Sequence, residues 1–129
     1  MKNILVVTDR NMEFIGRFAA SSRGEAFPLP ASKIKFTVCS AELAVTFMEN
    51  NAIQAAVISE EIRWKNGTPA AQDIIDAIKT NNCDNFDILI ILTKGNQKFN
   101  IPPEITVDYM NINSIPEEIS DFFRDHVYL

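Results

Sequence analysis

Residues 54–60 read Gln-Ala-Ala-Val-Ile-Ser-Glu, and this stretch decides the fold. Small or β-branched residues run without a charge from Ala55 to Ser59, and two carboxylates, Glu60 and Glu61, follow at once. Such a run is typical of a central parallel strand that is covered on both faces, where apolar and polar residues no longer alternate. In open α/β sheets, functional groups lie just beyond the carboxyl ends of the strands. We therefore expect a functional site to be built around Glu60.

The composition indicates one soluble domain spanning residues 1–129. The chain is 47% hydrophobic and 22% charged, which is ordinary for a globular protein able to bury a core. Its net charge of −5 argues against direct contact with nucleic acid or with an anionic membrane surface. Cys39 and Cys83 lie in no metal-binding spacing. We expect two reduced thiols, no metal, no cofactor and a cytoplasmic location.

The rest of the chain repeats a strand–helix pattern. Helical spacing of apolar residues predicts helices over about 12–22, 41–50, 68–80 and 115–126. The segment 94–104 lacks that spacing and contains two prolines, so a helix there is expected to be short or missing. The pattern predicts a flavodoxin-like α/β three-layer sandwich with a five-stranded parallel sheet of order 2-1-3-4-5. The expected strands are 3–8, 34–39, 54–60, 86–93 and 105–110.

Several residues predict where helices begin and which side they bury. Ser40 is a good N-cap for the second helix, and Pro69 fits the first turn of the third. Ser114 and Glu117 have the spacing of a capping box. In the final helix we expect Ile115, Ile119 and Phe122 to face the core, which leaves Phe123, Val127 and Tyr128 off that stripe.

In their order along five strands, the strand ends resemble those of a response-regulator receiver domain. Receivers carry an acidic pair after strand one, a phosphoacceptor aspartate after strand three, a Thr or Ser after strand four and a lysine after strand five. The segments that carry the resemblance cover nearly the whole chain: ILVVTDR (4–10), VISEEI (57–62), ILTKG (91–95) and DYMNINSIPEEI (108–119). The resemblance implies a module of two-component signalling.

Laid on the receiver pattern, the site residues of this chain depart from it. Thr8 replaces the first acid and Asp9 the second, while Glu60 takes the phosphoacceptor position. Ile112 stands where the lysine belongs. With one acid and the lysine lost, the resemblance implies a phosphorylation-independent pseudo-receiver. The remaining matches are Thr93 at the hydroxyl position, Lys94 where a small residue is usual, and Tyr109 at the switch-aromatic position.

Each of these residues also has a plainer interpretation. Glu60 either imitates a phosphorylated acceptor or is a strand-end carboxylate, solvated or paired with Lys94 or Arg10. Asp9 with Glu60 either retains a divalent cation or, as we expect, holds none. Thr93 and Tyr109 are either a coupled switch pair or packing residues. The exposed or off-stripe aromatic and apolar residues Trp64, Phe123, Val127 and Tyr128 are either partner contacts or cover for the core.

We expect a non-catalytic regulatory module that presents its last helix and neighbouring strand to a protein partner, to a further domain of a longer chain, or to a second copy. The alternatives are an active atypical receiver that accepts phosphate at Glu60 or Ser59, and a small flavodoxin-like enzyme. No glycine-rich loop follows the first strand, which argues against flavin or nucleotide binding. No Ser or Cys in the sequence stands out as a nucleophile that would pair with His126, so we assign this histidine no catalytic role.

Overall fold

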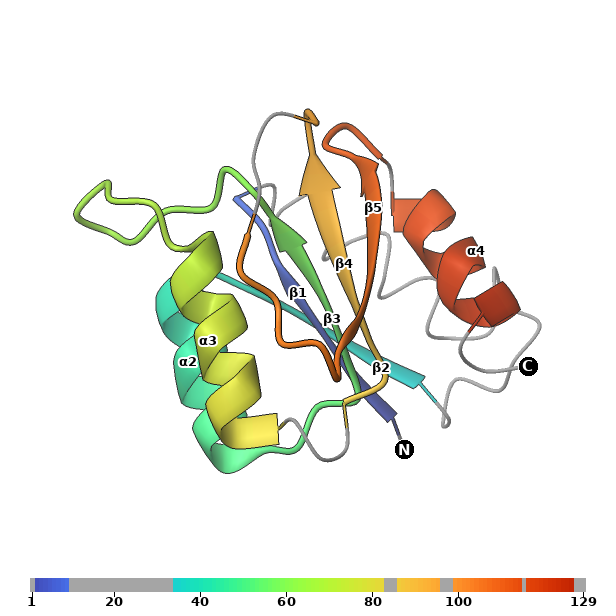
Figure 1. The fold of residues 1–129 in the computed structure, drawn as a ribbon, viewed down its shortest axis with the longest axis horizontal. Coiled ribbons are helices and arrows are strands. Elements are labelled where there is room, and N and C mark those ends of the chain that lie inside the picture. The colour runs from blue at the N-terminus through green and yellow to red at the C-terminus, as the bar shows by residue number, and fades with distance from the viewer. Residues whose placement is uncertain (1, 10–33, 83–85, 96–98, 115, 127–129) are drawn as a thin grey trace.

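Five parallel strands form one sheet in the order β2-β1-β3-β4-β5 (Figure 1). The computed structural model describes residues 2–9, 34–82, 86–95, 99–114 and 116–126. The flavodoxin-like α/β fold expected from the sequence is confirmed, including the order of the strands. The strands are β1 Lys2–Val7, β2 Ile34–Cys39, β3 Ala55–Ser59, β4 Ile88–Thr93 and β5 Thr106–Asn111. The helices among the described residues are α2 Ala41–Asn50, α3 Ala71–Asn82 and α4 Pro116–His126.

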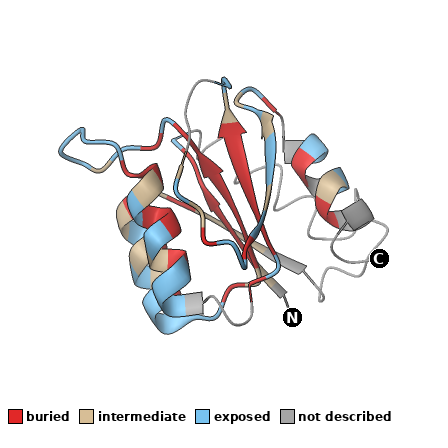
Figure 2. Cartoon of the chain, viewed as in Figure 1, coloured by how far each residue is buried: buried red, intermediate tan, exposed pale blue. Residues whose placement is uncertain are grey.

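The central strand β3 is buried along its whole length, as the run of small and β-branched residues predicted (Figure 2). Its side chains alternate between two cores. Ala56 and Ile58 join the cluster beneath α2 and α3, whereas Ala55 and Val57 join the cluster that contains Phe123 of α4. Gln54 fastens the start of the strand, because its side-chain oxygen accepts a hydrogen bond from the backbone N–H of Asn3 in β1 at 2.6 Å.

The two helices α2 and α3 lie on one face of the sheet and α4 lies on the other (Figure 1). Ser40 is the N-cap of α2 as expected, and its hydroxyl accepts from the N–H of Leu43 at 3.5 Å. The expected helix at 12–22 lies outside the described residues. None of the described helices is long and apolar enough to cross a membrane.

The expected beginning of α3 at Pro69 is wrong, because the helix begins at Ala71. Pro69 instead forms an antiparallel bridge with Arg63, so that the loop after β3 folds back on itself as a narrow hairpin. The hairpin is closed by a hydrogen bond from the N–H of Trp64 to the carbonyl of Thr68 at 2.9 Å. This local pairing satisfies backbone groups that a longer helix would have used.

The connection from β4 to β5 has no helix among its described residues 94–95 and 99–105, in agreement with the expectation from the sequence. Phe99 and Ile101 of this connection pack against the larger core and cover part of the sheet that a helix would otherwise cover. Tyr109 of β5 remains 49% exposed. Strand β5, at the edge of the sheet, is therefore open to solvent on the face that carries Tyr109.

The expected position of Phe123 off the core-facing stripe of the last helix is also wrong. Its side chain is fully buried and meets Phe36 and Phe122 edge-to-face, at ring-centroid distances of 6.1 and 5.8 Å. Ile119 and Phe123 are four residues apart on α4, so they lie above one another on the face that meets the sheet. Phe122 sits at the margin of that face, partly buried. Ile115, Val127 and Tyr128 lie outside the described residues, and so does Cys83.

Candidate functional site

The strand ends bring most of the residues singled out from the sequence to one edge of the sheet. Thr8 and Asp9 follow β1, Glu60 follows β3, and Thr93 is the last residue of β4. Ile112 follows β5 and is tied to the same edge, because its backbone N–H donates to the carbonyl of Thr93 at 3.0 Å. Parallel strands end at the same edge, which explains the meeting of residues that are far apart in sequence.

Glu60 is the centre of the arrangement. Glu60 is only 5% exposed, and each of its two carboxylate oxygens accepts a short hydrogen bond. The hydroxyl of Thr93 donates to Oε2 at 2.6 Å, and the backbone N–H of Lys94 donates to Oε1 at 2.6 Å. A buried carboxylate is costly unless it is hydrogen-bonded in this way, and bonds to an ionised acceptor are short and strong. Glu60 thus joins the ends of β3 and β4.

The turn after β4 is shaped to hold this carboxylate. Thr93 accepts a hydrogen bond from the N–H of Gly95 through the same hydroxyl that donates to Glu60, at 2.9 Å. Gly95 has a φ of +92°, a left-handed conformation that a residue with a side chain rarely adopts. The glycine therefore lets the chain bend sharply enough for two successive residues to donate to Glu60.

Lys94 contacts both glutamates, but through different groups. Its ammonium forms an ion pair with Glu61 at 2.6 Å, with both side chains about half exposed, and its backbone N–H serves Glu60. The hydrogen bond and charge of Glu61, and to a smaller degree the charge of Glu60, raise the pKa of Lys94, while partial desolvation opposes them. The suggested pairing of the Lys94 side chain with Glu60 is therefore wrong in detail, since the ammonium pairs with the neighbouring acid.

Ile112 contributes no charge to the site. Its side chain is partly buried and packs against the smaller core, on the side of the sheet that α4 covers. Ile112, the residue that the resemblance aligned with a lysine, is thus part of the hydrophobic packing.

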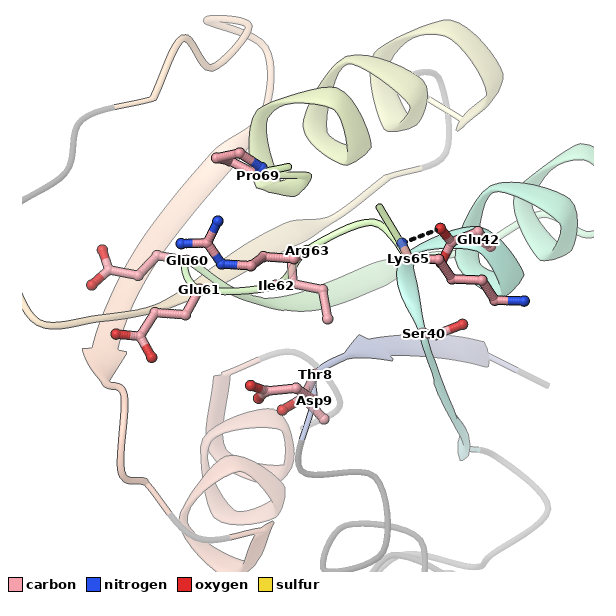
Figure 3. A pocket seen from close by; sticks show the side chains of 10 residues that line it. All are labelled: Thr8, Asp9, Ser40, Glu42, Glu60, Glu61, Ile62, Arg63, Lys65 and Pro69. Atoms are coloured by element: carbon pink, nitrogen blue, oxygen red, sulfur yellow. Dashed lines mark hydrogen bonds between the residues drawn. The ribbon is translucent and has the colours of Figure 1, made fainter. Parts of the chain in front are cut away.

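A pocket of about 680 Å³ opens above the ends of β1 and β3 (Figure 3). Thr8, Asp9 and Glu60 were expected near a site, and the pocket brings them together. Sequence reasoning missed the wall contributed by the hairpin after β3. That wall is held against α2, because Glu42 accepts a hydrogen bond from the backbone N–H of Lys65 at 2.8 Å. The remaining lining residues are Ser40, Glu42, Glu61, Ile62, Arg63, Lys65 and Pro69.

The described residues contain no group of three His, Cys, Asp or Glu side chains placed to hold a metal ion. Asp9 is exposed at the end of β1, and Thr8 beside it is 1% exposed and carries no charge. A divalent cation here would therefore depend on Asp9 and on a Glu60 whose two oxygens already accept hydrogen bonds.

Trp64 and Cys39 both pack into the larger core. The indole of Trp64 is partly buried against this core, and its N–H donates to Oδ2 of Asp73 at 3.1 Å. Cys39 is buried, as expected for a core cysteine, and burial raises the pKa of its thiol to about 12. Both residues have a structural role in the hairpin or the core.

Comparisons with known proteins support the fold and nothing finer. No family model and no curated protein matches the chain. Among solved structures, it resembles RSP, a Rex-family repressor, with a TM-score of 0.50 and 12% identity over 96% of this chain. It also resembles the E. coli constitutive lysine decarboxylase, with a TM-score of 0.51 and 15% identity over 97% of this chain. The alignments span 58% and 17% of those two proteins, respectively.

Proposed function

We propose that the protein is a non-catalytic regulatory module of receiver type, which has lost phosphotransfer and acts by binding a protein partner. The observation that carries this proposal is the state of Glu60: it is buried, and both of its oxygens accept hydrogen bonds. A phosphoacceptor must offer an oxygen lone pair to the incoming phosphorus. Each of these hydrogen bonds, from the Thr93 hydroxyl and from the Lys94 amide, lowers the nucleophilicity of the oxygen that accepts it.

The surroundings of Glu60 support the same proposal. Phosphoryl transfer needs cations that neutralise the charge developing on the phosphoryl oxygens. In this chain the receiver lysine is replaced by Ile112, which packs into the core, and the first receiver acid is replaced by Thr8. The ammonium of Lys94, whose backbone N–H donates to Glu60, pairs with Glu61. Ser59, the alternative acceptor, is 3% exposed.

Glu60 fits the role of a built-in substitute for a phosphorylated acceptor. Its longer side chain places a carboxylate against a hydroxyl and a backbone amide, which are donors suited to an oxyanion. A carboxylate carries one charge where a phosphoryl group carries nearly two, so the imitation is partial. In this proposal the domain is held permanently in one state, and partner binding needs no phosphorylation.

The surface proposed for partner binding is formed by α4 and β5. Among its described residues, Glu117, Glu118 and Asp121 of α4 and Asp108 of β5 are acidic and exposed. Tyr109 adds an exposed aromatic ring on the other face of β5. A partner that fits this surface carries basic groups opposite α4, since complementary charge guides association. We propose a cytoplasmic partner, which is either a separate protein or a further domain of a longer chain.

The experiment that tests the proposal is incubation with acetyl phosphate and Mg²⁺, followed by intact-mass measurement, with a phosphorylatable receiver domain treated in parallel. We expect no added phosphoryl group on this protein and a phosphorylated form of the control. Addition of one phosphoryl group would reject the proposal in favour of an active atypical receiver. Mapping of that group to Glu60 or Ser59 would identify the acceptor.

A further inference from the structure

We propose that the pocket above β1 and β3 binds a small zwitterion, that is, a molecule with an ammonium group and a carboxylate, such as an amino acid. The pocket lies where the strand order reverses, since the chain runs from β1 outward to β2 and then returns across β1 to β3. Open α/β sheets bind ligands at this point, beyond the carboxyl ends of the strands. A volume of about 680 Å³ lies in the range of small-molecule sites.

The walls of the pocket are held in place by contacts within the chain. The backbone of Lys65 is tied to Glu42 at 2.8 Å, which fixes the hairpin against the beginning of α2. A guanidinium N–H of Arg63 donates to the carbonyl of Gly67 at 2.8 Å, which braces the hairpin from within. The pocket is therefore built before a ligand arrives, and binding would not need to order this loop.

Of the six charged side chains that line the pocket, four already make a hydrogen bond or ion pair with a described residue. Glu60 accepts hydrogen bonds from the Thr93 hydroxyl and the Lys94 backbone N–H, and Glu61 forms an ion pair with the ammonium of Lys94. The carboxylate of Asp9 and the ammonium of Lys65 make no hydrogen bond or ion pair in the described part of the chain. A ligand with both an ammonium and a carboxylate would satisfy both groups.

The arrangement of the lining matches the two ends of such a ligand. In Figure 3 the carboxylates of Glu60 and Glu61 lie at one end of the pocket and Ser40 and Lys65 at the other, with Asp9 between them. Ser40 caps the beginning of α2, where the helix dipole adds partial positive charge. The ammonium of the ligand would face Asp9, and its carboxylate would face Lys65 and the start of α2.

The same lining disfavours other classes of ligand. A nucleotide or another polyanion would meet four carboxylates, those of Asp9, Glu42, Glu60 and Glu61. Only two cationic side chains of the lining, Arg63 and Lys65, could oppose them. An apolar ligand would leave these charges desolvated and unpaired, which is costly.

The test is a ¹H–¹⁵N NMR titration of the full chain with probes of equal chain length: δ-aminovalerate with both charges, cadaverine with two ammonium groups and glutarate with two carboxylates. L-alanine serves as a second zwitterion. We expect at least one zwitterion to shift the resonances of the lining residues and to bind about tenfold more tightly than cadaverine or glutarate, because each of these loses one charge-assisted contact. Equal or tighter binding of cadaverine or of glutarate would overturn the proposal, and so would the absence of shifts at the lining with every probe.

Two variants locate the site. Asp9→Asn and Lys65→Met each remove one charge and should weaken zwitterion binding about tenfold. Glu49→Gln and Lys79→Met are the matched controls, since both residues are exposed and neither lines this pocket. Unchanged affinity in Asp9→Asn or in Lys65→Met would overturn the assignment. The readout involves no protein partner and no phosphate, so its failure would leave the proposed function standing.

Discussion

Replacement of Thr93 by valine tests the contact on which the site depends. The two side chains have nearly the same shape, so the change removes the hydroxyl that donates to Glu60 at 2.6 Å and leaves the packing in place. A hydrogen bond to a charged group contributes about 1.5–3 kcal/mol, and the abandoned oxygen of a buried carboxylate puts the cost near the upper end. The hydroxyl also accepts from Gly95, but Gly95 is exposed and water can replace that contact. We expect a loss of about 2–3 kcal/mol in the free energy of unfolding, or about 6–10 °C in Tm for a chain of this size.

The measurement is urea unfolding followed by circular dichroism, with an unchanged m-value as evidence that the change acts on stability alone. Thr46→Val is the matched control, since Thr46 is exposed on α2 and its hydroxyl donates only to a carbonyl of its own helix, at 3.3 Å. That control should lie within about 0.5 kcal/mol of the wild type. A double-mutant cycle with Glu60→Gln should give a coupling energy of about 1–2 kcal/mol. Equal losses in Thr93→Val and Thr46→Val, or full additivity in the cycle, would refute the reasoning.

Three further predictions concern the core, the surface ion pair and the buried thiol. Phe123→Ala should lower the free energy of unfolding by about 3–5 kcal/mol, because the ring is fully buried. Tyr109→Ala should lower it much less, because the side chain of Tyr109 is half exposed. Equal losses in the two variants would contradict the burial of Phe123. Glu61→Gln should lower the pKa of Lys94 toward its usual value. The substitution should have a small effect on Tm, and this effect should vanish in 1 M salt, where the Debye length is about 3 Å. An effect on Tm that persists in 1 M salt would contradict a surface ion pair. In a Cys83→Ser background, Cys39 should resist alkylation at pH 8 until the protein is unfolded. Because burial raises the folded pKa of Cys39 from 9.0 to about 12, the folded state holds this proton longer, so stability should fall as pH rises from about 9 toward 12; rapid alkylation of the native protein would contradict this burial.

The order of the strands and their buried faces could be predicted because the signals are local and repeated. The run from Ala55 to Ser59 has no polar break, and its environment in the sheet is buried on both faces, as such runs predict. The break after Thr93 and the prolines at 102 and 103 correctly indicated that no helix occupies the described residues between β4 and β5.

The errors arose where tertiary contacts outweigh local preference. Pro69 has a strong preference for the first turn of a helix, but the pairing of Arg63 with Pro69 delays α3 to Ala71. The final helix offers Phe122 and Phe123 as neighbours, and spacing alone favoured Phe122, whereas the side chain that is fully buried is Phe123. The position of Phe36 beside Phe123 decides which of the two is fully buried, and that contact links residues far apart in sequence.

The candidate site was predictable as a set of residues but not as a set of contacts. Strand ends alone placed Asp9, Glu60, Thr93 and Lys94 at one edge of the sheet. The two hydrogen bonds to Glu60 depend on the sharp turn at Gly95, and the pairing of Lys94 with Glu61 depends on side-chain directions. The pocket wall formed by Arg63 and Lys65 depends on the hairpin after β3, and no periodicity in the sequence predicts that hairpin.

The most direct measurement of the central claim is the backbone amide resonance of Lys94. A short hydrogen bond to a carboxylate moves an amide proton downfield, and the acceptor of the Lys94 amide is Oε1 of Glu60. The resonance should move upfield in Glu60→Gln and stay in place in Glu61→Gln, where only the ammonium of Lys94 loses its partner. A Lys94 amide that is unmoved by Glu60→Gln would contradict the claim that the carboxylate of Glu60 is held inside the site.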